Sequence, residues 1–239
     1  MSKSIMIASG KGGTGKSTFT VNLGITLAYR GYNVVLVDLN LGLRTLDLYL
    51  GLENYALFDI GDILEERSSL DDVLIESHFC NRLKLLPGVQ QSFYDKLTKD
   101  KFSSIIEDLK SKFDYVIIDC PPGIGPTIEV AMGASDAAII VINANYISLR
   151  DADVVEDILS KSGIFNRACI MNRLSCDLTD IEAEVDIQTV SERLRSKIIG
   201  TIPDDCNIKA ATNLGVPIVV KRDTYIANNY QKISDRIME

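Results

Sequence analysis

Short runs of almost wholly apolar residues alternate along the chain with segments whose apolar residues recur at helical spacing. The apolar runs are SIMIAS near Ser4 to Ser9, then NVVLVD, NRLKLLPG, DYVIIDCPPG, DAAIIVINA, RACIMNR and KIIGTIP. Strands this uniformly apolar have no side that faces water, which is typical of a parallel sheet covered by helices on both faces. The pattern therefore predicts an α/β fold built on a mostly parallel, twisted sheet.

The segments between these runs carry the periodicity of helices that pack on a sheet. Residues 18–31 predict a helix that ends near Gly31, and residues 102–113 and 151–163 predict two more. Residues 41–77 are the least regular part of the chain, and we expect functional loops there. A last helix is predicted to pack on the sheet through an apolar stripe formed by Ile226, Tyr230, Ile233 and Ile237.

Composition narrows the class of protein. The 239 residues, 46% of them hydrophobic, suit a single α/β domain over residues 1–239 with a substantial core. The net charge of −8 argues against nucleic acid as a partner. No run approaches the roughly 20 apolar residues that span a bilayer, and the first apolar run is too short for the core of a signal peptide. We therefore expect a cytoplasmic protein.

A glycine-rich loop follows the first predicted strand and precedes the first predicted helix. Residues 10–18 read GKGGTGKST and match the phosphate-binding pattern G-x-x-x-x-G-K-[ST]. In this context the glycines turn backbone N–H groups toward a phosphate at the positive end of the helix. Lys16 is expected to reach the β- and γ-phosphates, and Ser17 to bind Mg²⁺. The pattern leaves a second lysine, Lys11, unexplained.

Acidic residues close two of the predicted strands, at the edge where ligands bind in open α/β sheets. Asp119 ends the strand YVIID, which suits a carboxylate that holds Mg²⁺ and its water shell, and Asp38 closes NVVLVD in the same way. Gly123, shortly after Asp119, is placed to sense a γ-phosphate. The sequence therefore predicts a magnesium-dependent nucleotide site with Ser17, Asp38 and Asp119 as metal-binding residues.

The loop KGGTGKST, with its additional lysine, resembles the deviant Walker A motif of the ParA/MinD family of ATPases, which are P-loop NTPases of the SIMIBI type. The resemblance continues in order through VDLNLGLRTLDLYLGLE, FDYVIIDCPPGI, SLRDADVV and GTIPDDCNIKAATNLGVPIV, and so covers nearly the whole chain. It implies an ATP- and Mg²⁺-dependent switch that acts in cell-division site selection or a related placement process. It also implies that the whole loop binds nucleotide: Gly10, Lys11, Gly12, Gly13, Thr14, Gly15, Lys16, Ser17 and Thr18.

The resemblance also implies partners. Lys11 corresponds to the family's signature lysine, which crosses an ATP-dependent homodimer interface to contact the partner's phosphates, so Lys11 and Lys16 are both expected to be catalytic. Asn172 corresponds to an asparagine that reads the adenine edge, and Pro203, Asp204 and Asp205 match the loop around the base. Thr45 lies where the family has its first switch. Regulatory partners of the MinC or MinE kind are expected.

The chain departs from the family's pattern at the end of its second strand. Where the family has D-x-D, this chain reads Asp38, Leu39, Asn40. An asparagine can position an attacking water by hydrogen bonding, but it has no negative charge and does not readily accept the water's proton. We therefore expect Asn40 to be a catalytic residue that supports only slow hydrolysis, whether it is the natural residue or an engineered one.

The second departure concerns the membrane. Members of the family usually continue into a basic amphipathic helix that binds anionic membrane, whereas residues 225–239 mix Lys232 and Arg236 with Asp235 and Glu239 on their polar face. Whether the protein contacts a membrane is therefore left open. We expect it to be cytoplasmic or peripheral to the inner face of the membrane. This departure also leaves open whether a membrane helix has been removed from the chain.

Two alternative functions remain at this point. Asn40 favours an adaptor that is locked by nucleotide and does not hydrolyse it. The shared loop also allows an electron or cluster carrier related to the nitrogenase iron protein, which needs cysteines that bind a cluster across a dimer. The chain has five scattered cysteines, without a disulfide or zinc pattern, and Cys120 is the candidate for such a ligand: Cys80, Cys120, Cys169, Cys176 and Cys206.

Overall fold

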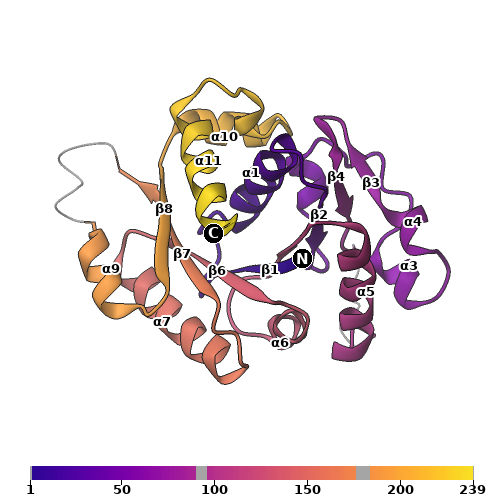
Figure 1. The fold of residues 1–239 in the computed structure, drawn as a ribbon, viewed down its shortest axis with the longest axis horizontal. Helices are drawn as coiled ribbons and strands as arrows, with labels where there is room; N and C mark the ends of the chain where they lie inside the picture. The colour runs from indigo at the N-terminus through magenta and orange to yellow at the C-terminus, as the bar shows by residue number, and fades with distance from the viewer. Residues whose placement is uncertain (1, 90–95, 176–183, 239) are drawn as a thin grey trace.

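The computed structural model describes residues 2–89, 96–175 and 184–238. Its centre is an eight-stranded sheet with the order β3-β4-β2-β5-β1-β6-β7-β8 (Figure 1). The strands are β1 (Lys3–Ala8), β2 (Val34–Asp38), β3 (Ile75–Ser77), β4 (Cys80–Leu86), β5 (Tyr115–Asp119), β6 (Ala137–Asn143), β7 (Arg167–Leu174) and β8 (Lys197–Pro203). The predicted α/β fold with a mostly parallel sheet is confirmed.

All neighbouring strands pair in parallel except β3 and β4. The seven parallel strands are the seven apolar runs of the sequence, and β2 and β5 are buried along their whole length. β3 escaped prediction because its three residues, IES, are too few to show a period. Because seven strands run the same way, their carboxyl ends gather at one edge of the sheet, where the loops after them meet.

Helices cover both faces of the sheet (Figure 1). The buried side chains of α1, α11 and the short α2 pack on one face of the sheet, and those of α5, α6 and α7 pack on the other. The helices are α1 (Lys16–Tyr29), α2 (Leu46–Tyr49), α3 (Ile60–Leu64), α4 (Leu70–Val73), α5 (Lys99–Lys112), α6 (Pro126–Gly133), α7 (Tyr146–Lys161), α9 (Ile187–Arg193), α10 (Cys206–Asn213), α11 (Tyr225–Met238) and the 3-10 helix η1 (Ile218–Val220).

The irregular segment after β2 consists largely of short helices, where the sequence predicted loops. Asp59 caps α3 by accepting a hydrogen bond from the Gly61 N–H at 2.8 Å, and the Asp62 side chain accepts from the Asp59 N–H in return. Ser69 and Asp72 make the same kind of box at α4. Helices of four or five residues have too few turns to show a 3.6-residue period, so caps define them better than periodicity does.

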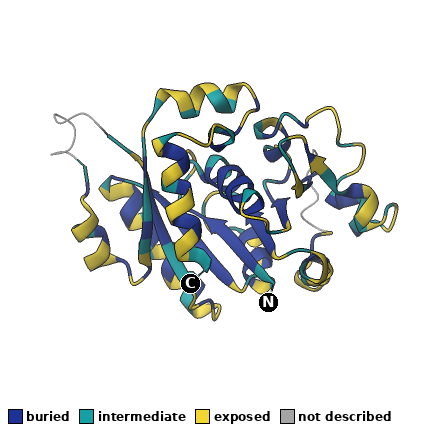
Figure 2. Ribbon diagram, turned by 45° about the horizontal axis from the view of Figure 1, so that its top comes forward, coloured by how far each residue is buried: buried dark blue, intermediate teal, exposed yellow. Residues whose placement is uncertain are grey.

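The last helix packs on the sheet as its apolar stripe predicted. Ile226, Tyr230 and Ile233 are each at most 2% exposed, and the outer side of α11 faces solvent (Figure 2). Ile233 fits against β8 at Gly200, where an added Cβ would come within 2.4 Å of the isoleucine side chain. In the part of the chain that the structure describes, no helix is long and apolar enough to cross a membrane.

Candidate nucleotide-binding site

The glycine-rich loop joins the end of β1 to the start of α1 in a conformation that requires glycine. Gly13 and Gly15 have φ angles of 76° and 91°, in the left-handed region that other residues rarely adopt. A Cβ on Gly10 would lie 2.6 Å from the carbonyl oxygen of Asp151 in α7. A backbone atom cannot move aside as a flexible side chain does. The loop therefore approaches α7 too closely at this point for any residue other than glycine.

Lys16 lies at the first turn of α1 and is only 7% exposed. Its ammonium group donates a hydrogen bond to the Ser9 hydroxyl at 2.7 Å, and Ser9 donates in turn to the Lys11 carbonyl oxygen at 2.7 Å. Burial lowers the pKa of Lys16, while the nearby Asp119 carboxylate opposes this change. A buried cation whose hydrogen-bond partner is a neutral hydroxyl is suited to receiving an anionic ligand.

Asp119 ends β5 and is 1% exposed. Its two oxygens accept hydrogen bonds from two hydroxyls of α1, Ser17 at 2.6 Å and Thr20 at 3.0 Å. Burial, together with the charge of Asp38, raises the pKa of Asp119 to about 7, against the opposing effects of Ser17 and Lys16. The predicted metal-binding pair Ser17 and Asp119 is thus in direct contact, and a divalent cation would remove the energetic cost of the buried negative charge.

Asp38 is in a different environment from Asp119. Its oxygens accept from three backbone N–H groups of the following loop, those of Asn40 at 2.9 Å, Thr45 at 2.7 Å and Leu46 at 2.9 Å. Burial raises the pKa of Asp38, and these N–H groups counteract the rise. Asp38 therefore anchors the loop of residues 39–46, and its predicted role in metal binding stays a prediction.

The same loop holds Asn40 and Thr45 next to each other. The Asn40 side-chain amide donates to the Thr45 hydroxyl at 3.3 Å. Arg44, whose φ of 44° is in the left-handed region, closes the loop by donating to the Asp47 carboxylate at 2.5 Å. Asn40 and Thr45 are thus presented as a hydrogen-bonded pair by a loop whose backbone is tied to the end of β2.

Lys11 and the glycines beside it lie on the outside of the loop. Gly12 and Gly13 are exposed, Lys11 is half-buried, and its ammonium group bonds to no other residue among those that the structure describes. By contrast, Thr14 is 1% exposed and its hydroxyl oxygen has no hydrogen-bond partner in the described chain. An unpartnered buried hydroxyl within such a loop is consistent with a ligand that supplies the missing bond.

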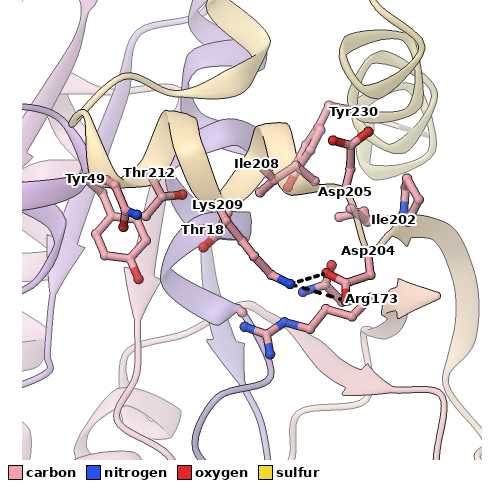
Figure 3. Close-up of a pocket in the computed structure, with 14 residues that line it drawn as sticks. Thr18, Tyr49, Arg173, Ile202, Asp204, Asp205, Ile208, Lys209, Thr212 and Tyr230 are labelled. Atoms are coloured by element: carbon pink, nitrogen blue, oxygen red, sulfur yellow. Dashed lines mark hydrogen bonds and ion pairs between the residues drawn. The ribbon is translucent and has the colours of Figure 1, made fainter. Parts of the chain in front are cut away.

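The residues predicted to surround a base come together in a cavity of about 150 Å³ beside the loop (Figure 3). Asn172, at the end of β7, donates its side-chain N–H to the Thr14 carbonyl oxygen at 2.7 Å and leaves no space for a side chain at Gly15. Thr18, Asn172, Pro203, Asp204 and Asp205 all line this cavity. The cavity thus begins at the phosphate loop and extends between the ends of β7 and β8.

Sequence reasoning missed several residues of this cavity: Tyr49, Arg173, Ile208, Lys209 and Tyr230. Lys209 forms an ion pair with Asp204 at 3.2 Å at its mouth (Figure 3). Arg173 directly follows Asn172, and Lys209 lies in α10, the helix that begins after Asp205. Their closeness in sequence to predicted residues could have identified both. Tyr230 gave none, because a tyrosine in a helical stripe has the pattern of an ordinary core residue.

The remaining predicted residues are also accounted for. Gly123 has a φ of 84°, and its N–H donates to the Ser9 carbonyl oxygen at 3.0 Å, which ties the loop after β5 to the glycine-rich loop. Cys120 is 1% exposed, and burial raises the pKa of its thiol. A thiol buried in this way is not presented to a second subunit, which weakens the interpretation as a cluster carrier.

The donor set fits a nucleotide with Mg²⁺. The described residues hold no cluster of three or more His, Cys, Asp or Glu side chains that could bind a metal ion by themselves. Mg²⁺ usually binds through one or two carboxylates together with substrate phosphates and waters, so Ser17 and Asp119 are sufficient on the protein side. The fold and this site together define a P-loop nucleotide-binding protein of the α/β class.

Comparisons with known proteins identify the family within this class. A family model described as an AAA domain matches residues 2–168. The septum site-determining protein MinD of Synechocystis is 37% identical over 238 residues, which cover 99% of this chain and 90% of that protein. MinD of Bacillus subtilis is 35% identical over 240 residues, with coverage of 100% and 90%. The solved MinD structure from Aquifex aeolicus superposes with a TM-score of 0.90 at 33% identity over 99% of this chain and 97% of that one. The chain belongs to the MinD family of ATPases.

Proposed function

We propose that this chain is an ATP-dependent dimerising switch that helps to place the division septum, and that it hydrolyses ATP slowly. The observation that carries the proposal is the contrast between two lysines on one loop. Lys16 is buried beside Asp119, whereas the ammonium group of Lys11 has no partner among the described residues. One lysine thus serves the nucleotide of its own chain, and the other is available to the nucleotide of a second copy.

The nucleotide and the metal are supported by a solved relative. The MinD protein of Pyrococcus horikoshii was solved in complex with Mg-ADP; it is 30% identical to this chain and superposes with a TM-score of 0.89 over 99% of it. In this chain the loop N–H groups and Lys16 would hold the phosphates, while Ser17 and Asp119 would hold the metal. Bound Mg²⁺ would neutralise charge that develops on the phosphate oxygens.

Adenine is the base that the cavity favours. One N–H of the Asn172 amide is committed to the Thr14 carbonyl oxygen, which leaves the amide oxygen as an acceptor and the second N–H as a donor, the pair that matches N6 and N7 of adenine. An acceptor in this place complements the N6 amino group of adenine and opposes the O6 acceptor of guanine. We therefore infer ATP as the substrate, with Asn172, Pro203, Asp204 and Asp205 around its base.

Slow hydrolysis follows from the hydrogen bond between Asn40 and Thr45. One N–H of the Asn40 amide is donated to Thr45, and the amide oxygen is the acceptor that remains to align an attacking water. An amide oxygen orients a water but does not accept its proton readily, and general-base catalysis contributes about 10²–10⁴-fold to a rate. If hydrolysis is absent altogether, the chain is instead a nucleotide-locked adaptor; a single-turnover assay with labelled ATP separates these two functions.

A solved relative supports the proposed partner. A solved MinC:MinD cell division complex from Aquifex aeolicus contains a chain that is 33% identical to this one and superposes with a TM-score of 0.91. We propose a regulatory partner of the MinC kind, recruited in the ATP state, and a cytoplasmic protein that can lie at the inner face of the membrane. The net charge of −8 speaks against nucleic acid as the surface it uses.

Light scattering of the purified protein tests the switch. With ATP and Mg²⁺ we expect the mass of a dimer, and with ADP and Mg²⁺ that of a monomer, because only the γ-phosphate contacts differ between the two states. Lys11→Ala should still bind nucleotide and remain monomeric with ATP. A wild-type protein that binds ATP and stays monomeric at high concentration would overturn the proposal.

A further inference from the structure

The outer edge of β8 is an unpaired strand edge in the described part of the chain. β8 is the last strand in the sheet order and pairs with β7 on one side (Figure 1). Alternate backbone N–H and C=O groups along residues 197–202 therefore point away from the sheet, and of these residues Ile199 has its carbonyl oxygen occupied by Arg236. Such an edge is a template for pairing with another strand unless the protein protects it.

A groove of about 530 Å³ runs along this edge, lined by β8, α9, α11 and residues 194–196, which join α9 to β8. β8 contributes Lys197, Ile198, Gly200 and Thr201, α9 contributes Ile187 and Ser191, and α11 contributes Arg236. Ile187 is 50% exposed, so an apolar side chain lies open at the rim. The groove thus combines free backbone groups with apolar surface, as sites of strand addition do.

The charge of the groove is positive although the chain as a whole is acidic, with a net charge of −8. Its lining contains Arg195, Lys197 and Arg236 and no carboxylate. Arg195 is balanced by Asp157 and Glu156, whereas Lys197 and Arg236 form no ion pair with any described residue. Arg236 instead donates to the Ile199 carbonyl oxygen at 2.6 Å, which places its guanidinium group directly against the strand.

The same features restrict which strand can pair here. The pairing register shifts between Cys169 and Ile170 of β7, opposite Ile199, and such irregularities, like edge lysines, discourage pairing between identical edges. If the β8 edges of two copies paired, Lys197 and Arg236 of one copy would face the same cations of the other. An acidic strand meets complementary charge at the same positions, so the edge rejects its own copy and accepts an acidic segment.

We propose that β8 is the docking edge for an extended, acidic segment of a partner protein, which adds to the sheet as a further strand. Backbone hydrogen bonds supply affinity, Ile187 accepts an apolar side chain, and Lys197 and Arg236 select carboxylates. The edge lies apart from the glycine-rich loop, and this inference does not depend on the nucleotide function.

The test uses a fluorescein-labelled heptapeptide that alternates glutamate with valine, and its binding is followed by fluorescence anisotropy. We expect saturable binding that weakens about tenfold in Lys197→Glu, since close charge pairs at an interface couple by more than 1 kcal/mol. Lys221→Glu is the matched control, because Lys221 is exposed and lies outside the groove. ATP binding measured on each variant checks that the fold is intact.

Two further measurements separate strand addition from attraction between charges alone. The same peptide with alternate amides N-methylated retains its charge but loses backbone donors, and it should not bind. Amide hydrogen exchange should show new protection in β8 only with the unmodified peptide. The proposal is overturned if no saturable binding occurs at millimolar peptide, if the methylated peptide or an oligonucleotide of equal charge binds as well, or if Lys221→Glu weakens binding as much as Lys197→Glu.

Discussion

Asp119 and Glu156 are two carboxylates of nearly the same exposure, at 1% and 0%. Asp119 lies where β5 ends, and Glu156 lies beside the residues that precede the start of β8. Glu156, in α7, accepts from the backbone N–H groups of Ser196 at 2.6 Å and Arg195 at 2.8 Å, and from the side chains of both residues. Asp119 accepts from two hydroxyls of one helix.

The consequence appears in their pKa values. Burial by itself would raise the pKa of Glu156, but the Ser196 hydroxyl and the backbone N–H groups outweigh it and lower the value. For Asp119 burial prevails, and its pKa rises to about 7. Two carboxylates of equally low exposure thus differ in pKa, because Asp119 is more strongly desolvated, lies near the charge of Asp38 and accepts fewer hydrogen bonds. A structural carboxylate has its hydrogen bonds completed by the protein, and a carboxylate with an incomplete set is placed for a ligand.

The largest expected effect is at Lys16. Lys16→Ala removes the buried cation next to Asp119, and with it the charge-assisted contact that phosphate is proposed to make. We expect ATP affinity to fall by about 10³-fold, as losses of a buried charge partner do, while the fold persists. Isothermal titration calorimetry measures the affinity, and thermal unfolding serves as the fold control; tight ATP binding by the variant would contradict the site.

A substitution at Glu156 should have the opposite result: it should lower stability and leave ATP affinity unchanged. Glu156→Gln keeps the shape but replaces a carboxylate that accepts hydrogen bonds from Arg195 and Ser196 with a neutral amide, and should reduce the free energy of unfolding by about 3 kcal/mol. Because the folded-state pKa is lowered, its stabilising contribution is present above the ordinary pKa of 4.5 and is lost as pH falls through the folded value. Urea unfolding at pH 7 measures the loss; ATP affinity below the transition should be unchanged.

The third prediction adds a charge at Asn40, near the carboxyl ends of the parallel strands, and concerns the rate of hydrolysis. Asn40→Asp supplies a proton acceptor, and the Thr45 hydroxyl can donate to the new carboxylate, so the loop geometry is retained. We expect turnover to rise by up to about 10²-fold, the lower end of general-base contributions, because phosphoryl transfer depends mainly on positioning. Phosphate release at saturating ATP is compared for both proteins. Equal rates would mean that another group aligns the water or that chemistry is not the slow step.

The smallest effect is expected for Asp119→Asn in the protein free of Mg²⁺ and nucleotide. Since the folded-state pKa is raised above the ordinary 3.8 to about 7, the charged form is disfavoured by folding, and stability falls as pH rises between these values. The raised pKa corresponds to about 4 kcal/mol at pH 8, and about half of this is offset because the amide oxygen accepts from only one of the two hydroxyls of α1. The variant should therefore be more stable than the wild type by about 2 kcal/mol, and its pH slope between 4 and 7 should be flatter. A less stable variant would mean that Asp119 is structural like Glu156.

The sequence predicted the central strands and the glycine loop because both are local patterns. The positions of Asp119 and Asn172 followed from strand ends, and the structure brings both next to residues 10–18. What escaped prediction depends on the detailed path of the loops. Nothing near Thr14 indicated that its hydroxyl has no hydrogen-bond partner among the described residues. The N–H groups that surround Asp38 belong to a loop whose path periodicity does not describe.

The assembly of the base cavity has a consequence for synthesis of the chain. β1, which positions the glycine loop, lies between β5 and β6, and Asn172 secures that loop across 158 positions. The cavity is completed by Tyr230, near the end of the described chain. A nascent chain on the ribosome thus carries the loop early but cannot close the cavity until α11 has emerged, and such long-range closure is slow. Nucleotide would therefore act late in folding, by trapping the finished protein and not by templating its first strands.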